Sequence, residues 1–110
     1  MPYYRLITFG CKVNQYDSAG LAQELAARGW SEAPAGVRPE LILVNTCTVT
    51  ARADQEARQV IRRLGREFPG VPIWVTGCYA QRAPGELASL PGVRGVLGNS
   101  EKLQIAAWLE

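Results

Sequence analysis

The chain has 110 residues and a formal net charge of +2, and 47% of its residues are apolar while 20% are charged. These values are typical of one globular domain and leave no room for two. The chain contains no histidine, which excludes serine–histidine–aspartate triads, cysteine–histidine pairs and every histidine metal site.

The chain's first residues, MPYYRLITF, have no charged n-region and no long apolar run, and no stretch approaches the roughly 20 apolar residues of a membrane span. We therefore expect no signal peptide, no membrane contact and a cytoplasmic location. Thiols stay reduced in that compartment, so the three cysteines, an odd number, do not predict a disulfide framework.

The first part of the chain predicts a strand, a helix and a loop. Residues 3–9 are rich in β-branched and aromatic side chains, which favours a strand. A helix is expected to begin at a cap formed by Asp17 or Ser18 and to stop just before Gly29. Residues 30–39, with two prolines and one glycine, are typical of a loop. The apolar face of the helix would consist of Leu21, Ala22 and Leu25.

The middle of the chain predicts a buried strand and the longest helix. Residues 41–44 (LILV) form a short apolar run, which suits a strand that is buried on both faces of a parallel sheet. The helix is expected over residues 50–68 and is ended by Pro69 and Gly70. Its apolar stripe has helical spacing and consists of Ala53, Ala57, Val60, Ile61, Leu64 and Phe68.

The last part predicts a third strand over residues 71–76, a short helix over 84–90 and a weaker fourth strand over 93–97. Ser100 is expected to cap a final helix that carries Leu103, Ala106 and Ala107. Strands and helices therefore alternate along the chain. This order predicts an α/β fold with an open parallel four-stranded sheet and helices on both faces, a three-layer sandwich of the flavodoxin or Rossmann type.

Each cysteine follows one predicted strand: Cys11 the first, Cys47 the second and Cys78 the third. The carboxyl ends of parallel strands meet at one edge of a sheet, where ligands bind. Because neighbouring strands lie about 4.8 Å apart, we expect these three distant residues to converge on one small patch.

Three converging thiolates suit zinc, copper(I) or an iron–sulfur cluster. A structural zinc site normally has four protein ligands, and no histidine or fourth cysteine is available here. A four-iron cluster held by three cysteines would keep one iron open. Two alternatives stay open at this point. Free cysteines often only pack in a core, and a lone reactive thiol or a redox pair fits the same residues.

Small and polar residues flank the cysteines. Gly10 and Gly77 precede two of them, and they either let the backbone approach a bulky cofactor or serve as ordinary turn glycines. Asn14 and Gln15, together with Asp17, either support the cysteine ligands or merely begin the helix. The residues considered as supports for the ligands are Gly10, Asn14, Gln15, Asn45, Thr46 and Gly77.

Arginines are frequent in the longest predicted helix. They lie away from its apolar stripe, so they either meet phosphates or a partner domain or form a solvated face. These residues are Arg52, Arg58, Arg62, Arg63 and Arg66.

Each cysteine lies in a distinct motif: TFGCKVNQYDS (residues 8–18), VNTCTVT (44–50) and VTGCYAQ (75–81), and the stretch VLGNSEK (96–102) follows them. Together these stretches resemble the N-terminal domain of the radical-SAM methylthiotransferases. The resemblance implies that Cys11, Cys47 and Cys78 bind one auxiliary [4Fe–4S] cluster with one open iron. The stretches GCKVNQYDS and ADQEARQVIRRL further resemble the subgroup that methylthiolates N6-threonylcarbamoyladenosine (t6A) beside the tRNA anticodon.

The resemblance also implies what this chain lacks. In that family S-adenosylmethionine (SAM) and a second [4Fe–4S] cluster belong to a radical-SAM domain with a CxxxCxxC motif, which is followed by a small RNA-binding domain. The chain has no such motif, and we expect both domains to be absent from it. We therefore expect residues 1–110 to be one domain of a larger transferase, catalytically incomplete alone, with tRNA and the radical-SAM domain of the same polypeptide as partners. The whole enzyme would add a methylthio group to C2 of a modified adenosine next to the anticodon. The alternatives are an α/β binding module with structural cysteines and a stand-alone iron–sulfur carrier.

Overall fold

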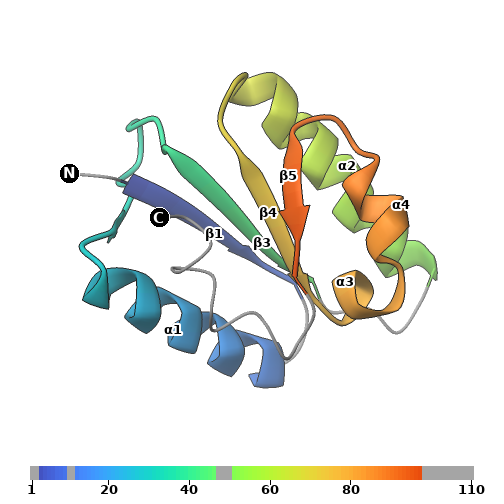
Figure 1. Ribbon diagram of the computed structural model, residues 1–110, viewed down its shortest axis with the longest axis horizontal. Helices are drawn as coiled ribbons and strands as arrows, with labels where there is room; N and C mark the ends of the chain where they lie inside the picture. Colours follow the sequence, from blue (N-terminus) through green and yellow to red (C-terminus); the bar gives the residue numbers. More distant parts are fainter. Residues whose placement is uncertain (1–2, 10–11, 47–50, 98–110) are drawn as a thin grey trace.

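The computed structural model of the protein describes residues 3–9, 12–46 and 51–97. In these residues a twisted parallel sheet lies between helix α1 on one face and helices α2, α3 and α4 on the other (Figure 1). The bounds of the strands are β1 (Tyr3–Thr8), β2 (Ser31–Glu32), β3 (Leu41–Thr46), β4 (Ile73–Gly77) and β5 (Val93–Val96). The bounds of the helices are α1 (Lys12–Ala27), α2 (Ala51–Glu67), α3 (Cys78–Arg82) and α4 (Pro84–Ala88).

The five strands lie in the order β2-β1-β3-β4-β5, and every neighbouring pair is parallel. The chain moves outward from β1 to β2 and then crosses to the other side of β1 to form β3. The direction of winding therefore changes between β1 and β3, which is the kind of switch point where open α/β sheets bind ligands. The predicted α/β fold with a parallel sheet and helices on both faces is confirmed.

The central strand β3 is buried along its whole length, and its side chains alternate between two cores. Leu41 and Leu43 pack with Leu21 and Leu25 of α1. Ile42 and Val44 pack on the opposite face with a larger cluster. That cluster includes Ala57, Ile61 and Leu64 of α2 together with Ile73 and Val75 of β4. A continuous apolar run is required because neither face of this strand meets water.

Helix α1 begins earlier than predicted. It starts at Lys12, so Asp17 and Ser18 lie inside the helix and their predicted role as its cap is wrong. Aspartate and serine cost only a few tenths of a kcal/mol inside a helix, and the packing of the helix on the sheet outweighs this cost. Asn14 and Gln15 accordingly belong to its first turn.

The predicted end of α1 is confirmed. Gly29 has a φ of +87° and its N–H bonds the carbonyl of Ala26, while the N–H of Trp30 bonds the carbonyl of Leu25 at 2.9 Å. These two bonds define a Schellman motif, in which glycine is favoured because of its positive φ. Trp30 also packs against the core cluster that contains Leu25, which is the apolar contact that often accompanies the motif.

Two elements were missed by the sequence analysis. Strand β2 has two residues and pairs with β1 inside the segment predicted as a loop, so the sheet has five strands rather than four. Such a strand is too short to show a periodic pattern. Helix α3 is also short, and it is fixed by contacts distant in sequence, as described below. Helix α2 and strands β3, β4 and β5 lie where they were predicted, within one to three residues.

The predicted final helix, with Ser100, Leu103, Ala106 and Ala107, lies outside the described residues. Among the helices that the structure describes, none is long and apolar enough to cross a membrane.

We predict that Ile61→Ala destabilises the protein by about 2–5 kcal/mol, because this fully buried side chain fills the core between α2 and the sheet. Chemical denaturation followed by circular dichroism measures this change. The exposed neighbour Gln59 serves as a control on the same helix, and Gln59→Ala should change the stability by less than about 0.5 kcal/mol. Equal losses in both variants would contradict the described packing.

Candidate functional site

The three strands that precede the cysteines end level with one another at the carboxyl edge of the sheet. Thr8 pairs with Asn45, Asn45 pairs with Thr76, and Thr46 pairs with Gly77. Thr46 and Gly77 are the residues that directly precede Cys47 and Cys78. The chain segments that carry these cysteines therefore leave from register partners on neighbouring strands, about 4.8 Å apart.

The first strand is held to the same edge. The N–H of Phe9 donates to the carbonyl of Asn45 at 2.9 Å, which extends the pairing of β1 and β3 beyond the last residue of β1. Cys11 follows two residues later in the sequence. The edge lies at the switch point between β1 and β3, the expected place for a ligand in this architecture.

The predicted ligands themselves are described only in part. Cys11 and Cys47, together with Gly10, lie outside the described residues, and Cys78 is the first residue of α3. Within the described part of the chain, no three histidine, cysteine, aspartate or glutamate side chains gather closely enough to hold a metal ion. The predicted set of Cys11, Cys47 and Cys78 therefore stays a prediction.

Polar side chains are buried where the apolar strands reach this edge. Asn45, Thr46 and Thr76, which we call the polar edge, expose 0%, 1% and 1% of their surface. The hydroxyl of Thr46 donates to the carbonyl of Thr76 at 2.7 Å and so ties β3 to β4. The hydroxyl of Thr76 has no hydrogen-bond partner among the described residues. A buried hydroxyl without a partner is rare in proteins and needs an explanation.

The backbone conformation at this edge requires glycine at position 77. Its φ is +102°, and a Cβ atom there would overlap the carbonyl oxygen of Thr46 and lie 2.7 Å from the nitrogen of Thr46. The glycine therefore lets β4 end against β3 and turn directly into α3. This local cause is present whether or not a cofactor lies nearby.

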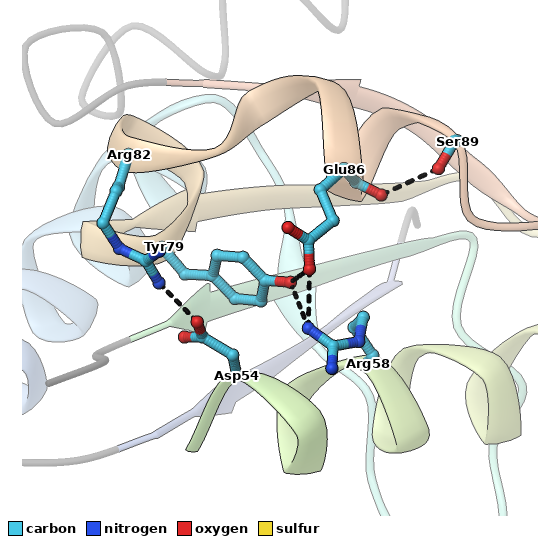
Figure 2. A network of polar contacts seen from close by, with 6 residues as sticks. All are labelled: Asp54, Arg58, Tyr79, Arg82, Glu86 and Ser89. Carbon is cyan, nitrogen blue, oxygen red and sulfur yellow. Dashed lines mark hydrogen bonds and ion pairs between the residues drawn. The ribbon is translucent and has the colours of Figure 1, made fainter. Parts of the chain in front are cut away.

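A network of polar contacts holds α3 against α2 and α4 (Figure 2). The hydroxyl of Tyr79 donates to Oε1 of Glu86, and Nη1 of Arg58 donates to the same hydroxyl at 2.7 Å and to Glu86 at 2.6 Å. At the other end of α3, Nη2 of Arg82 donates to Oδ2 of Asp54 at 2.5 Å. The guanidinium of Arg82 also lies over the ring of Tyr79, 5.3 Å from its centroid.

Tyr79 is the centre of this network. Its side chain is fully buried in the core beneath α2 and α4. Burial raises the pKa of its phenol, and the hydrogen bond to Glu86 raises the pKa further, against the lowering effect of Arg58. The neutral phenol is therefore the stable form, and it serves as the donor to the Glu86 carboxylate.

The network has a consequence for the carboxyl edge of the sheet where β1, β3 and β4 end and the cysteine-bearing segments begin, which we call the cysteine edge. Helix α3 has five residues, and a helix of this length is not stable by itself in water. The contacts of Tyr79 and Arg82 with α2 and α4 therefore fix the backbone that begins at Cys78. No local pattern in the sequence points to these contacts, because the partners are distant along the chain. The prediction that Arg58 belongs with the arginines that meet solvent, phosphates or a partner domain is wrong, since Arg58 pairs with Tyr79 and Glu86.

The structure therefore defines the class of this protein. It is a doubly wound α/β domain with buried polar residues at its switch point. The chain matches the family described as "Uncharacterized protein family UPF0004" over residues 3–98. The chain therefore belongs to the UPF0004 family.

The curated relatives that resemble the chain are methylthiotransferases. It is 38% identical over 103 residues to "Threonylcarbamoyladenosine tRNA methylthiotransferase MtaB" of Bacillus subtilis, which covers 94% of this chain and 23% of the relative. The protein of the same name from Thermotoga maritima is 38% identical over 105 residues, covering 96% of this chain and 24% of the relative. "Ribosomal protein uS12 methylthiotransferase RimO" of Chloroflexus aurantiacus is 36% identical, covering 94% of this chain and 23% of the relative.

These similarities confirm the predicted resemblance to the methylthiotransferase N-terminal domain and to the t6A subgroup. The chain spans about a quarter of the length of the relatives that it matches.

We predict that Gly77→Ala destabilises the protein by about 3 kcal/mol or more, because the new methyl group meets the backbone of Thr46 at a positive φ. Gly85 in α4 is a matched control, since it has open space around it and alanine favours a helix. Gly85→Ala should leave the stability unchanged or raise it by up to about 1 kcal/mol. Thermal and chemical denaturation of both variants test this contrast, and equal effects would contradict it.

A second prediction concerns Tyr79. Tyr79→Phe keeps the buried ring but removes the donor to Glu86, and we expect a loss of about 1–2 kcal/mol at neutral pH. Because the pKa of Tyr79 is raised in the folded protein, its contribution is complete below pH 10 and is lost as the pH rises above that value. The difference in unfolding free energy between the parent and Tyr79→Phe should therefore shrink above pH 10. A constant difference up to the highest pH at which the parent folds would contradict the raised pKa.

Proposed function

We propose that this chain is the auxiliary cluster-binding domain of a tRNA methylthiotransferase, in which Cys11, Cys47 and Cys78 hold one [4Fe–4S] cluster. The observation that carries the proposal is the register at the carboxyl edge. There β1, β3 and β4 end side by side, and a cysteine follows each of them in the sequence. Parallel strand ends at a switch point are where this architecture binds ligands.

The chemistry of the edge fits such a group. Three thiolates are the ligands that iron–sulfur clusters prefer, and hydrogen bonds to cluster sulfurs are among the interactions that tune them. The Thr76 hydroxyl is buried and has no partner among the described residues, so it could donate a hydrogen bond to a cluster sulfur. The Thr46 hydroxyl holds β3 and β4 together and keeps the two cysteine-bearing segments close. When bound, a three-cysteine cluster supplies sulfur, or a methylated sulfur, at the iron that no cysteine holds.

The described residues then have distinct roles around the ligands. The glycine at position 77 and the Tyr79 network orient the backbone that begins at Cys78. Asn45 and Thr76 place buried polar groups on the α1 face of the sheet next to the cysteine-bearing segments, and Thr46 places one on the α2 face. Exclusion of water from the buried side of the site would limit the access of solvent to a bound cluster.

The remaining chemistry belongs to other parts of a larger protein. The chain has three cysteines and no CxxxCxxC motif, so it does not hold the second cluster that cleaves SAM. We propose that a radical-SAM domain of the same polypeptide supplies that step. The product is a methylthio group on C2 of a modified adenosine next to the anticodon. The relatives named for threonylcarbamoyladenosine tRNA, and the stretch GCKVNQYDS, support t6A as the substrate.

The proposal predicts that the chain, reconstituted with iron and sulfide without oxygen, binds about four irons and four sulfides. Cys11→Ala, Cys47→Ala and Cys78→Ala should each lose most of this iron and the visible absorption of the cluster, because each removes one of three ligands. Iron, sulfide and absorption are measured together, and circular dichroism verifies that each variant folds. Gln59→Ala, on the exposed side of α2, should bind as much iron as the parent.

Three outcomes would contradict the proposal. If all three cysteine variants keep the iron and sulfide of the parent, the cysteines are structural and the chain is a binding module. Transfer of the cluster to an apo acceptor protein would identify a carrier. Cleavage of SAM by the reconstituted chain would contradict the assignment of that step to another domain.

A further inference from the structure

The exposed arginines of this protein differ in whether they have partners. Several are paired: Arg52 with Glu56, Arg28 with Glu24, and Arg38 with the carbonyl of Pro69. By contrast, four exposed arginines have no hydrogen bond, ion pair or ring contact among the described residues. These four are Arg62, Arg63 and Arg66 on α2 and Arg94 on β5.

Three of the four surround one region at the amino end of the sheet. Arg62 and Arg66, one helical turn apart, line a hollow of about 490 Å³ together with Gly70 and Gly92. Arg94 lines an adjoining hollow of about 250 Å³ that shares the same two glycines. We call Arg62, Arg66 and Arg94 the arginine surface. In Figure 1 the end of α2 and the start of β5 lie at the opposite end of the sheet from α3.

The walls of these hollows leave the arginine charge uncompensated. They consist otherwise of glycine, proline and valine, and no acidic residue lines either hollow. Gly70 and Gly92 have φ values of +85° and +88°, a conformation that disfavours any larger side chain at these positions. Like charges one turn apart weaken a helix, so folding gains nothing from placing Arg62 and Arg66 together. An anion from outside the chain is the partner that this arrangement suits.

We propose that the arginine surface binds the phosphate backbone of the RNA substrate, an inference that rests on the proposed tRNA function. Arginine binds phosphate through two parallel N–H groups, which a single ammonium does not offer. The net charge of the whole chain is only +2, so the attraction is local to this surface. Apart from the arginines, no long side chain lines the hollows, so a bulky backbone can approach the guanidinium groups.

The distance between the arginine surface and the cysteine edge fits one bound RNA. Helix α2 begins at Ala51, its first turn is tied to α3 by the contact of Asp54 with Arg82, and its last turns carry Arg62 and Arg66. At 1.5 Å per residue, Arg62 and Arg66 lie about 16 and 22 Å along the axis from Ala51. A folded RNA arm can therefore place one base at the cysteine edge while its stem lies along α2 and meets these arginines.

The test uses the full chain without a cluster, so that its result does not depend on the iron chemistry. Binding of a fluorescent RNA stem-loop, of the size of an anticodon arm, is followed by anisotropy over a series of salt concentrations. The triple variant Arg62→Gln, Arg66→Gln and Arg94→Gln should bind at least about tenfold more weakly at low salt. The slope of log K against log salt should fall by about 1 for each arginine removed.

A charge-matched control separates this surface from general attraction. Arg28 directly follows the last residue of α1, on the other face of the sheet, and is paired with Glu24. The single variants Arg66→Gln and Arg28→Gln remove the same charge, but only Arg66→Gln should weaken RNA binding. Equal weakening by both would overturn the proposal in favour of net charge alone.

Unchanged RNA binding by the triple variant would overturn the proposal. Equal competition by polyglutamate and by RNA of the same charge would overturn it too and would point to an acidic protein partner. If the cysteine variants keep their iron but RNA binding still depends on these arginines, the proposed cluster ligands are wrong. The proposal that the arginine surface binds RNA is then supported independently.

Discussion

The burial of β3 on both faces is the constraint on which the rest of this structure depends. Its six residues have no contact with water beyond 1% of their surface, so α1 must cover one face while α2 covers the other. That requirement forces the chain to wind in both directions from β1. The winding creates the switch point between β1 and β3, and it aligns the strand ends at which the cysteine-bearing segments begin.

The carboxyl end of the sheet changes from an apolar to a polar interior within a few residues. Val44 belongs to the apolar core, whereas Asn45 and Thr46 place amide and hydroxyl groups in the same dry environment. Gly77 and the network around Tyr79 then hold the next segment tightly against this edge. Buried polar groups cost free energy unless they are hydrogen-bonded, so the Thr76 hydroxyl, which has no partner among the described residues, supports the proposal of a ligand at this edge.

Helix α2 joins the two regions to which we assign function. Its buried stripe of Ala57, Ile61 and Leu64 secures it to the sheet. Its first turns supply Asp54 and Arg58 to the contacts that hold α3, and its last turns carry Arg62 and Arg66. A rigid helix of this length keeps the cysteine edge and the arginine surface at a constant separation, which a substrate that spans both would require.

The sequence by itself determined the α/β class, four of the five strands, and the positions of the cysteines after three of them. These features depend on local patterns, such as the apolar run of β3 and the glycine that ends α1. Only the tertiary structure decided the start of α1, the existence of β2 and α3, and the separation of Arg58 from the unpaired arginines. The reason is physical. A two-residue strand or a five-residue helix has too few local interactions to be stable, and contacts such as Tyr79 with Arg58 and Glu86 join residues that no sequence period connects.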